Sequence, residues 1–168
     1  SLKDIDLSTI AKFKELAAKR FPAAAKEKSV TSLLEKLHLL HKGKLTRAAI
    51  LLFGKDPRKF YISSYIKIGR FKDEATLLSM DDIYGNLFQQ AEDAIEVLKK
   101  KYLQAEIKIE KLHREEELEY PEPALREAIV NAIVHRDYST VHTQLKIYPD
   151  HLSLWNNGEL TQKLTLEK

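Results

Sequence analysis

The sequence predicts an α+β fold in which helices pack on a mixed, largely antiparallel sheet. Apolar residues recur with the 3.6-residue period of a helix in several segments, of which residues 123–139 are the clearest. Two later segments, 143–148 and 151–155, alternate as strands do and flank a Pro149-Asp150 turn. The order helix, strand, tight turn and strand predicts an antiparallel hairpin that lies beside the preceding helix.

Residues 1–60 are expected to form a basic helical segment. One amphipathic helix is predicted from Leu7 to Arg20, and a second from Ser29, a favourable N-cap, to His41. Residues 45–53 fit either a short helix capped by Thr46 or a buried strand, and the pattern alone does not separate the two.

Residues 61–168 are expected to hold the sheet and to form one compact unit with the first segment. Alternation predicts strands over residues 61–71 and 105–113, the second leading to an acidic turn at 114–117. Between the strands a long helix is predicted over residues 81–102, because acids at its start and lysines at its end suit the helix dipole.

Three polar side chains line one side of the predicted helix over residues 123–139. Glu127, Asn131 and His135 lie four residues apart and therefore stack beside the apolar stripe. A carboxylate can accept a proton from water, an amide oxygen can bind a hard cation, and an imidazole can face a phosphate. The same spacing also describes an ordinary solvated helix face, so both interpretations stand at this point.

The segment EYPEPALREAIVNAIVHRDYS, followed by LKIYPDHLSLWNNGEL, resembles the carboxy-terminal region of a group of bacterial and archaeal transcriptional regulators. These proteins are also described as RecG-related ATP-dependent DNA helicase homologues. In them a divergent Alba-type DNA-binding domain precedes a middle region and a histidine-kinase-like ATPase module. Residues 33–40, 45–57 and 85–90 are similar to the middle region. The resemblance implies that this chain is a fragment with the middle region and an incomplete ATPase module, and that the DNA-binding domain precedes it.

The ATPase module of those proteins belongs with gyrase, the MutL proteins and the histidine kinases, and the resemblance implies roles for the helix residues. Glu127 would activate the attacking water as a catalytic base. Asn131 would be the metal ligand that holds Mg²⁺ against the triphosphate, and His135 would lie near the phosphates. The implied cofactors of the whole protein are therefore ATP and Mg²⁺. None is expected in the fragment, which lacks the later nucleotide lid.

The next motif of that superfamily contains an aspartate, two residues before a glycine, that accepts a hydrogen bond from adenine. Here Asn156 stands in that position, before Asn157 and Gly158. The resemblance places Asn156 and Gly158 at the nucleotide. However, an asparagine brings no charge, and its amide can donate as well as accept.

Two functions follow from the resemblance. In the first, the chain is part of a DNA-binding transcriptional regulator and serves as a nucleotide-responsive module or as a scaffold and dimerisation module. The alternative is an ATP-dependent, helicase-related or ATP-hydrolysing enzyme, although the sequence contains no Walker-type lysine loop. DNA would be bound through the preceding domain, and the fragment by itself is expected to be inactive.

The net charge of +3 is unevenly distributed. Residues 1–60 contain 14 Lys or Arg against six Asp or Glu, a net charge of +8, and residues 61–168 contain 14 against 19, a net charge of −5. The basic segment fits either weak, sequence-independent contact with DNA phosphates or a set of solvated helix faces.

Three further expectations come from composition and from the predicted sheet. The absence of cysteine excludes a disulfide framework and a thiolate zinc site. No apolar run is long enough to span a membrane, so we expect no membrane partner and a cytoplasmic protein. A homodimer is expected, because DNA-binding regulators commonly match symmetric sites and because an incomplete sheet would expose apolar surface near Trp155 and Leu160.

Overall fold

Two compact units make up the chain. The computed structural model describes residues 1–103, 105–110 and 113–159, and it describes side chains outside residues 104–118. The first unit comprises Ser1–Ser64 and Gly85–Gln89, and the second comprises Tyr65–Tyr84 and Gln90–Lys168. Residues 85–89 therefore belong with the first unit, although they lie far along the sequence from its other residues.

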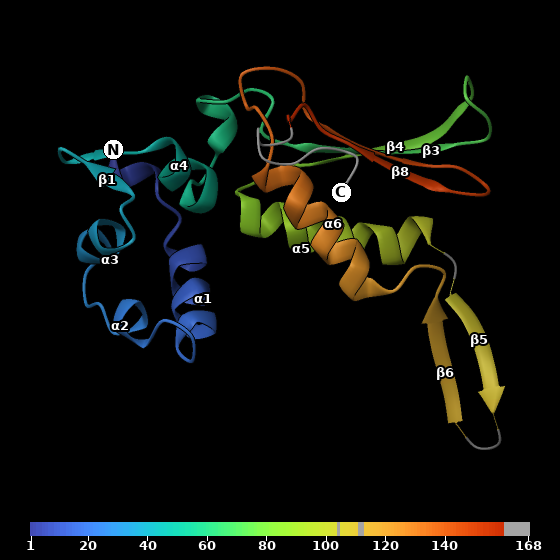
Figure 1. The fold of residues 1–168 in the computed structure, drawn as a ribbon, viewed down its shortest axis with the longest axis horizontal. Coiled ribbons are helices and arrows are strands. Elements are labelled where there is room, and N and C mark those ends of the chain that lie inside the picture. The colour runs from blue at the N-terminus through green and yellow to red at the C-terminus, as the bar shows by residue number, and fades with distance from the viewer. Residues whose placement is uncertain (104, 111–112, 160–168) are drawn as a thin grey trace. The chain divides into compact units, whose positions relative to one another are not determined.

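The first unit is mostly helical (Figure 1). Its helices are α1 (Leu7–Ala17), α2 (Pro22–Ala25), α3 (Val30–Lys36) and α4 (Arg47–Phe53), with short 3-10 turns η1 (Leu2–Asp4) and η2 (Pro57–Lys59). Helix α1 stops a few residues short of the predicted Arg20. The Thr46 hydroxyl accepts a hydrogen bond from the Ala49 amide at 3.2 Å, so residues 45–53 form the capped helix and not the strand.

Helix α3 ends at Lys36 and not at the predicted His41. His38 adopts the left-handed backbone conformation with φ 56°, and the amide of Leu39 returns to the carbonyl of Leu34 at 2.7 Å. This geometry closes a helix, but a glycine or asparagine usually occupies the left-handed position. The pattern around His38 therefore does not reveal the helix end.

A short hairpin takes the place of the last predicted turn of that helix. Strands β1 (Leu40–His41) and β2 (Lys44–Leu45) pair antiparallel around Lys42 and Gly43, which have φ values of 49° and 73°. Positive φ at both central residues is the requirement of the tight turns that suit twisted hairpins. The hairpin is therefore a defined structure and not a loose connection.

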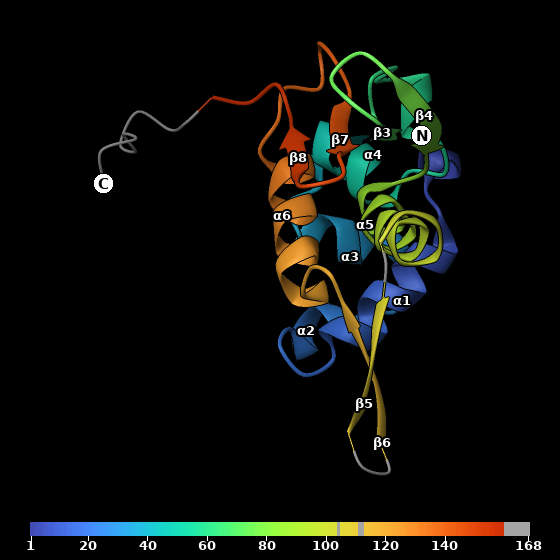
Figure 2. The same cartoon turned by 90° about the vertical axis from the view of Figure 1, so that its right-hand side faces the viewer.

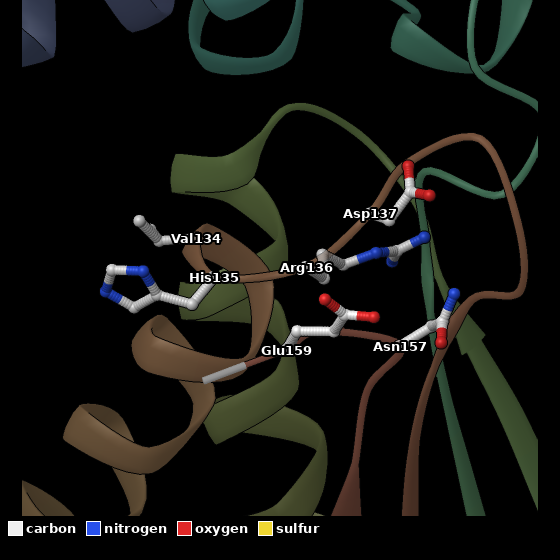
Figure 3. A pocket seen from close by; sticks show the side chains of 7 residues that line it. Val134, His135, Arg136, Asp137, Asn157 and Glu159 are labelled. Atoms are coloured by element: carbon white, nitrogen blue, oxygen red, sulfur yellow. The ribbon is translucent and has the colours of Figure 1, made fainter. Parts of the chain in front are cut away.

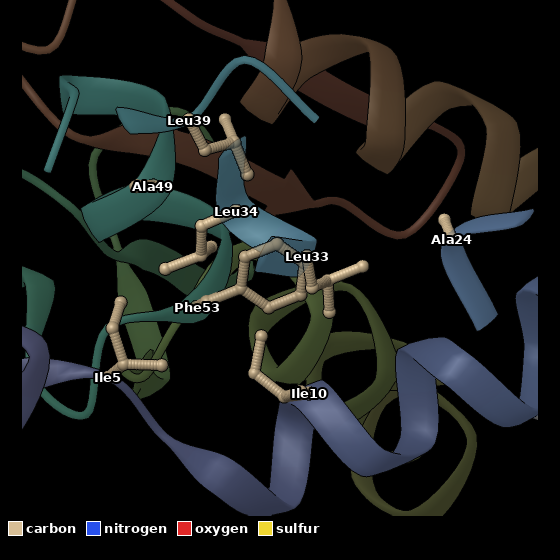
Figure 4. Packing of buried hydrophobic residues seen from close by; sticks show 8 residues of the cluster. All are labelled: Ile5, Ile10, Ala24, Leu33, Leu34, Leu39, Ala49 and Phe53. Atoms are coloured by element: carbon tan, nitrogen blue, oxygen red, sulfur yellow. The ribbon is translucent and has the colours of Figure 1, made fainter. Parts of the chain in front are cut away.

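Apolar side chains from α1, α3 and α4 form the core of the first unit (Figure 4). Leu33 and Phe53 are at most 1% exposed, and Ile10 packs in the same cluster. The rings of Phe13 and Phe88 have centroids 5.4 and 5.6 Å from that of Phe53. Phe88 belongs to the segment 85–89, which explains why that segment is part of this unit.

Within the described residues, a four-stranded sheet of order β4-β3-β7-β8 forms the centre of the second unit. The strands are β3 (Ile66–Phe71), β4 (Leu77–Ile83), β7 (Thr143–Ile147) and β8 (Leu152–Trp155). Strands β3 and β7 are parallel, and the other neighbours are antiparallel. The predicted α+β class with a mixed, largely antiparallel sheet is confirmed, and β7 and β8 form the predicted hairpin.

Helices lie on one face of this sheet (Figures 1 and 2). They are α5 (Leu87–Val97), which continues into the π-helical turn η3 (Leu98–Tyr102), and α6 (Glu122–Val134). The sheet contributes the buried side chains of Ile66, Ile68 and Leu145, and α6 contributes those of Ile129 and Ile133. Helix α6 thus confirms a helix within the predicted residues 123–139, although it ends at Val134, and its apolar stripe faces the core.

The start of α5 differs from the prediction. Asp81 and Asp82 lie in strand β4, and Gly85, with φ 101°, separates that strand from the helix. Asn86 caps the start of the helix. Its Oδ1 accepts a hydrogen bond from the backbone amide of Gln89 at 3.2 Å, and the Gln89 Oε1 accepts one from the backbone amide of Asn86 at 2.9 Å. This reciprocal pair is a capping box. It sets the helix start despite the acidic pair earlier in the chain.

The predicted acidic turn over residues 114–117 is also wrong. These residues lie in strand β6 (His113–Leu118), which pairs antiparallel with β5 (Ala105–Glu110). Strand β5 confirms most of the strand predicted there. Leu160, expected at an exposed apolar surface, lies outside the described residues.

Candidate functional site

Helix α6 carries three of the predicted site residues on its solvent side. Glu127, Asn131 and His135 are exposed, whereas Leu125 and Ile129 on the opposite side are buried. The separation follows from the helical period. His135 terminates the helix, and its amide donates to the carbonyl of Asn131 at 3.0 Å. The three side chains therefore share one side of α6, while their catalytic and metal-binding roles stay predictions.

Asn156 follows β8 directly, and its side chain turns toward the end of α6. Its Nδ2 donates to the carbonyl oxygen of Ala132 at 2.7 Å and to that of His135 at 3.1 Å. The last carbonyls of a helix have no partner within the helix, so this amide supplies donors that the helix end needs. An ionised aspartate could not donate, and its charge would face the negative end of the helix dipole. Asn156 acts here as a helix cap from a distant segment.

The two residues after Asn156 hold the loop that follows α6. The Asn157 Nδ2 donates to the Thr140 hydroxyl at 2.6 Å, and the Asn157 carbonyl accepts from the amide of Asp137 at 2.7 Å. A Cβ built on Gly158 would lie 2.1 Å from the carbonyl oxygen of His135, which is far inside van der Waals contact. Glycine is therefore required by close backbone approach.

Arg136 fixes the same loop from the inside. Its side chain donates to the carbonyl of Tyr65 at 3.4 Å, the hydroxyl of Thr143 at 3.2 Å and the carbonyl of Val141 at 3.1 Å. Its guanidinium carbon lies 4.2 Å from the centroid of the Tyr138 ring. Burial lowers the pKa of Arg136, and the neighbouring Tyr138 partly opposes this effect. The guanidinium thus serves to organise the backbone between α6 and β7.

Tyr138 adds a second buried connection. Its hydroxyl donates to the carbonyl of Ile133 in the last turn of α6. Burial raises the pKa of Tyr138 to about 12, against the opposing effect of Arg136. The phenol is therefore neutral at physiological pH and remains a donor to the helix end.

A cavity of about 510 Å³ lies where these segments meet (Figure 3). It is lined by Val134, His135, Arg136, Asp137, Asn157, Gly158 and Glu159. In Figure 3 the His135 ring points away from Arg136 and Glu159. Of the predicted site residues, His135 and Gly158 line the cavity, whereas the side chains of Glu127, Asn131 and Asn156 are not part of its lining.

The described lining of this cavity does not by itself support an adenine nucleotide with Mg²⁺. The carboxylates of Asp137 and Glu159 would repel a phosphate that carries no metal ion, and the Arg136 guanidinium donates to the loop. The Asn156 amide donates to α6. Over the side chains that the structure describes, no group of three His, Asp or Glu residues gathers to hold a metal ion. Asn131 as a Mg²⁺ ligand stays a prediction.

Three residues that build the cavity were not among the predicted site residues. Arg136, Asp137 and Asn157 lie next to predicted site residues, but their partners come from distant segments. The contact of Arg136 with Tyr65 spans 71 positions and has no local sequence signal. The sequence Asn156-Asn157-Gly158 indicates a tight turn. That this turn caps the end of α6 depends on the packing of β8 beside α6, which the sequence does not show.

Comparisons with known proteins give a fold and no function. Residues 1–68 match a family described as a domain of unknown function (DUF8451). Among curated proteins, none matches the sequence significantly. The crystal structure of the DIP2311 protein from Corynebacterium diphtheriae is similar over 98% of this chain, with a TM-score of 0.69 and 23% sequence identity. The chain spans 33% of that protein's length, and at this identity the likeness shows the fold alone.

Among the helices of the described residues, none combines the length and apolar character that crossing a membrane requires.

Proposed function

We propose that this chain is a scaffold module of a DNA-binding transcriptional regulator, in which α6, β7 and β8 form an ATPase-like framework that does not hydrolyse ATP. The observation that carries the proposal is the Asn156 amide, which donates to the carbonyls of Ala132 and His135. In the ATPases that the sequence resembles, an aspartate in this position accepts from adenine. Here the same position is committed to a helix end. The DNA-binding part of the proposal is supported by the family resemblance and by the charge of +8 on residues 1–60.

Calorimetric titration of ATP with Mg²⁺ into the chain tests this proposal. We expect no saturable binding by the wild type. The informative variant is Asn156→Asp, which restores the carboxylate of the ATPase motif. If Asn156 is a cap, N156D lowers stability and creates no ATP binding. Tighter ATP binding by N156D than by the wild type would contradict the scaffold proposal.

A nucleotide-responsive module is the second candidate, and the exposed Glu127 and Asn131 on one side of α6 favour it. It predicts saturable ATP binding in the micromolar range that Asn131→Ala abolishes. Glu127→Gln is the matched control, because it removes the base but leaves the metal ligand. An ATP-hydrolysing or helicase-related enzyme would in addition release phosphate, and release would depend on Glu127.

Self-association as a homodimer is part of the scaffold proposal. Trp155 at the end of β8 is 45% exposed, and β8 is a terminal strand of the described sheet. Exposed strand edges with apolar side chains favour pairing with another chain. Light scattering at high micromolar concentration is expected to give twice the mass of the chain. A monomer under those conditions would remove dimerisation from the proposal.

A further inference from the structure

The β1–β2 hairpin and the start of α4 lie in a segment that is rich in positive charge. From residue 37 to residue 55 the sequence contains four Lys or Arg and no Asp or Glu. Lys42 and Lys44 lie at the tip of the hairpin, Arg47 follows it at the start of α4, and all three are exposed. None of these three forms an ion pair with a carboxylate in the part of the chain whose side chains are described.

The backbone holds these cations in place. The pairs Leu40 with Leu45 and His41 with Lys44 close the hairpin. Leu40 and Leu45 pack against the core cluster of the first unit, and the amide of Thr46 donates to the carbonyl of Leu39 at 3.0 Å. The apolar base of the hairpin is therefore anchored, while its tip is left in solvent. A cationic tip on an anchored base loses less conformational entropy on binding than lysines on a flexible segment.

Arg47 is also positioned in advance. Its guanidinium carbon lies 5.3 Å from the centroid of the Tyr61 ring. A guanidinium over an aromatic face keeps its charge, and its N–H groups still point outward along the plane. Such a group suits a phosphate, which it can bind with two hydrogen bonds.

We propose that the β1–β2 hairpin, together with Arg47, contacts the phosphate backbone of duplex DNA without reading its sequence. Lys42, Lys44 and Arg47 are donors for phosphate oxygens, and contacts to phosphates carry no sequence information directly. An anionic membrane is a poorer partner, because the hairpin exposes no large apolar side chain for insertion. The choice of DNA as the polyanion rests on the proposed function. The charge and geometry of the hairpin are observed independently of that proposal.

Fluorescence anisotropy of a labelled random-sequence duplex, titrated with the full chain at several salt concentrations, tests the contact. Lys42→Gln with Lys44→Gln is expected to weaken binding about tenfold at 0.1 M salt and to reduce the slope of log K against log salt by about 2. Arg47→Gln alone is expected to reduce that slope by about 1. The matched control is Lys19→Gln with Arg20→Gln, which removes two exposed cations that follow α1 and lie outside the hairpin. The control variant is expected to bind as the wild type does.

Several outcomes would overturn the inference. These are no duplex binding by the wild type at 50 mM salt, an equal loss in the control variant, or unchanged binding by both hairpin variants. Binding of the wild type to phosphatidylserine vesicles but not to duplex would assign the hairpin to a membrane instead. Circular dichroism checks that the variants fold. If the double variant does not fold, R47Q supplies an independent measurement of duplex binding. The ATP titration has a separate readout, so failure here leaves the scaffold proposal to be judged by its own result.

Discussion

In the first unit the Asn86 side chain is completely buried, whereas in the second unit Asn156 lies half-buried at the end of one helix. The Asn86 Nδ2 donates to the Thr9 hydroxyl at 2.9 Å and to the Gly54 carbonyl at 3.4 Å, and its Oδ1 caps α5. The Asn156 Nδ2 donates to two carbonyls at the end of α6. The same residue type thus joins three segments of a closed core in one unit and finishes a single helix beside an open cavity in the other. Loss of the Asn side chain should therefore cost far more in the first unit.

The largest effect is expected for Asn86→Ala. The substitution removes the donor to the Thr9 hydroxyl oxygen and to the Gly54 carbonyl, and it removes the acceptor of the Gln89 backbone amide at the start of α5. Unsatisfied buried groups of this kind cost about 1–3 kcal/mol each, so we expect a loss of about 3 kcal/mol in the free energy of unfolding. Urea unfolding followed by circular dichroism measures it. A loss below about 1 kcal/mol would mean that the two asparagines are equivalent and that the comparison fails.

Arg136→Met is expected to be next, with a loss of about 2 kcal/mol. Methionine keeps much of the volume but removes the donors to Tyr65, Val141 and Thr143. Arg136→Lys is the control, because it keeps the charge but not the planar fork, and it should lose a part of that energy. Hydrogen exchange should show the amides of residues 137–142 opening first. If Arg136→Met exchanges as slowly as the wild type, Arg136 does not organise this loop.

Asn156→Ala should cost only about 1 kcal/mol, because Asn156 is half-buried and its hydrogen bond with the His135 carbonyl is exposed to solvent. Asn156→Asp should cost more than Asn156→Ala, since it adds a negative charge at the negative end of α6. Thermal unfolding of both variants gives the order. The reverse order, with the aspartate more stable than the alanine, would argue that Asn156 does not cap the helix.

The smallest effect is expected for Asp6→Asn in the first unit. The Asp6 carboxylate accepts from the Ser8 backbone amide at 3.0 Å, the Thr9 hydroxyl at 2.8 Å and the Gln89 side-chain Nε2 at 3.2 Å. Burial raises the pKa of Asp6, but the hydrogen bonds from Ser8 and Thr9 outweigh it, and the net pKa is lowered. Asp6→Asn should lose about 0.5–1 kcal/mol at pH 7.

This effect should depend on pH. Because the pKa of Asp6 is lower in the folded state, the carboxylate stabilises the fold at pH values above its unfolded-state pKa of about 4. This stabilisation disappears as the pH falls through the folded-state pKa. The difference between wild type and Asp6→Asn should therefore shrink below about pH 4. Urea unfolding at pH 7, 5 and 3 measures it. A difference that stays constant to pH 3 would show that the Asp6 charge contributes nothing.

The parts of the fold that were predictable have local causes. Helix α6 and the β7–β8 hairpin follow from periodicity within a few residues, and the exposed placement of Glu127, Asn131 and His135 follows from the helical period. The start of α5 was predictable in principle, because Gly85, Asn86 and Gln89 spell a capping box. The acidic pair Asp81-Asp82 suggested an earlier start, since an edge strand of mixed polarity resembles a helix start.

The remaining features depend on contacts between distant segments. His38 takes a conformation that its residue type disfavours, so only the packing of the hairpin after it explains the end of α3. The burial of Arg136 requires the carbonyl of Tyr65, just before β3, and a carbonyl from the loop before β7. The role of Asn156 at the end of α6 could not be read from its resemblance to an adenine-binding position, because that role depends on where the helix ends in space.

Trp155 has a practical consequence for all of these measurements. It is the single tryptophan of the sequence, it precedes Asn156, and it pairs across the sheet with Gln144. Its side chain is 45% exposed, so its emission responds to changes in solvent contact. The protein thus carries a built-in fluorophore at the cavity corner of the second unit. Quenching by iodide can report ligand entry, subunit pairing or loosening of the α6 end without a chemical label.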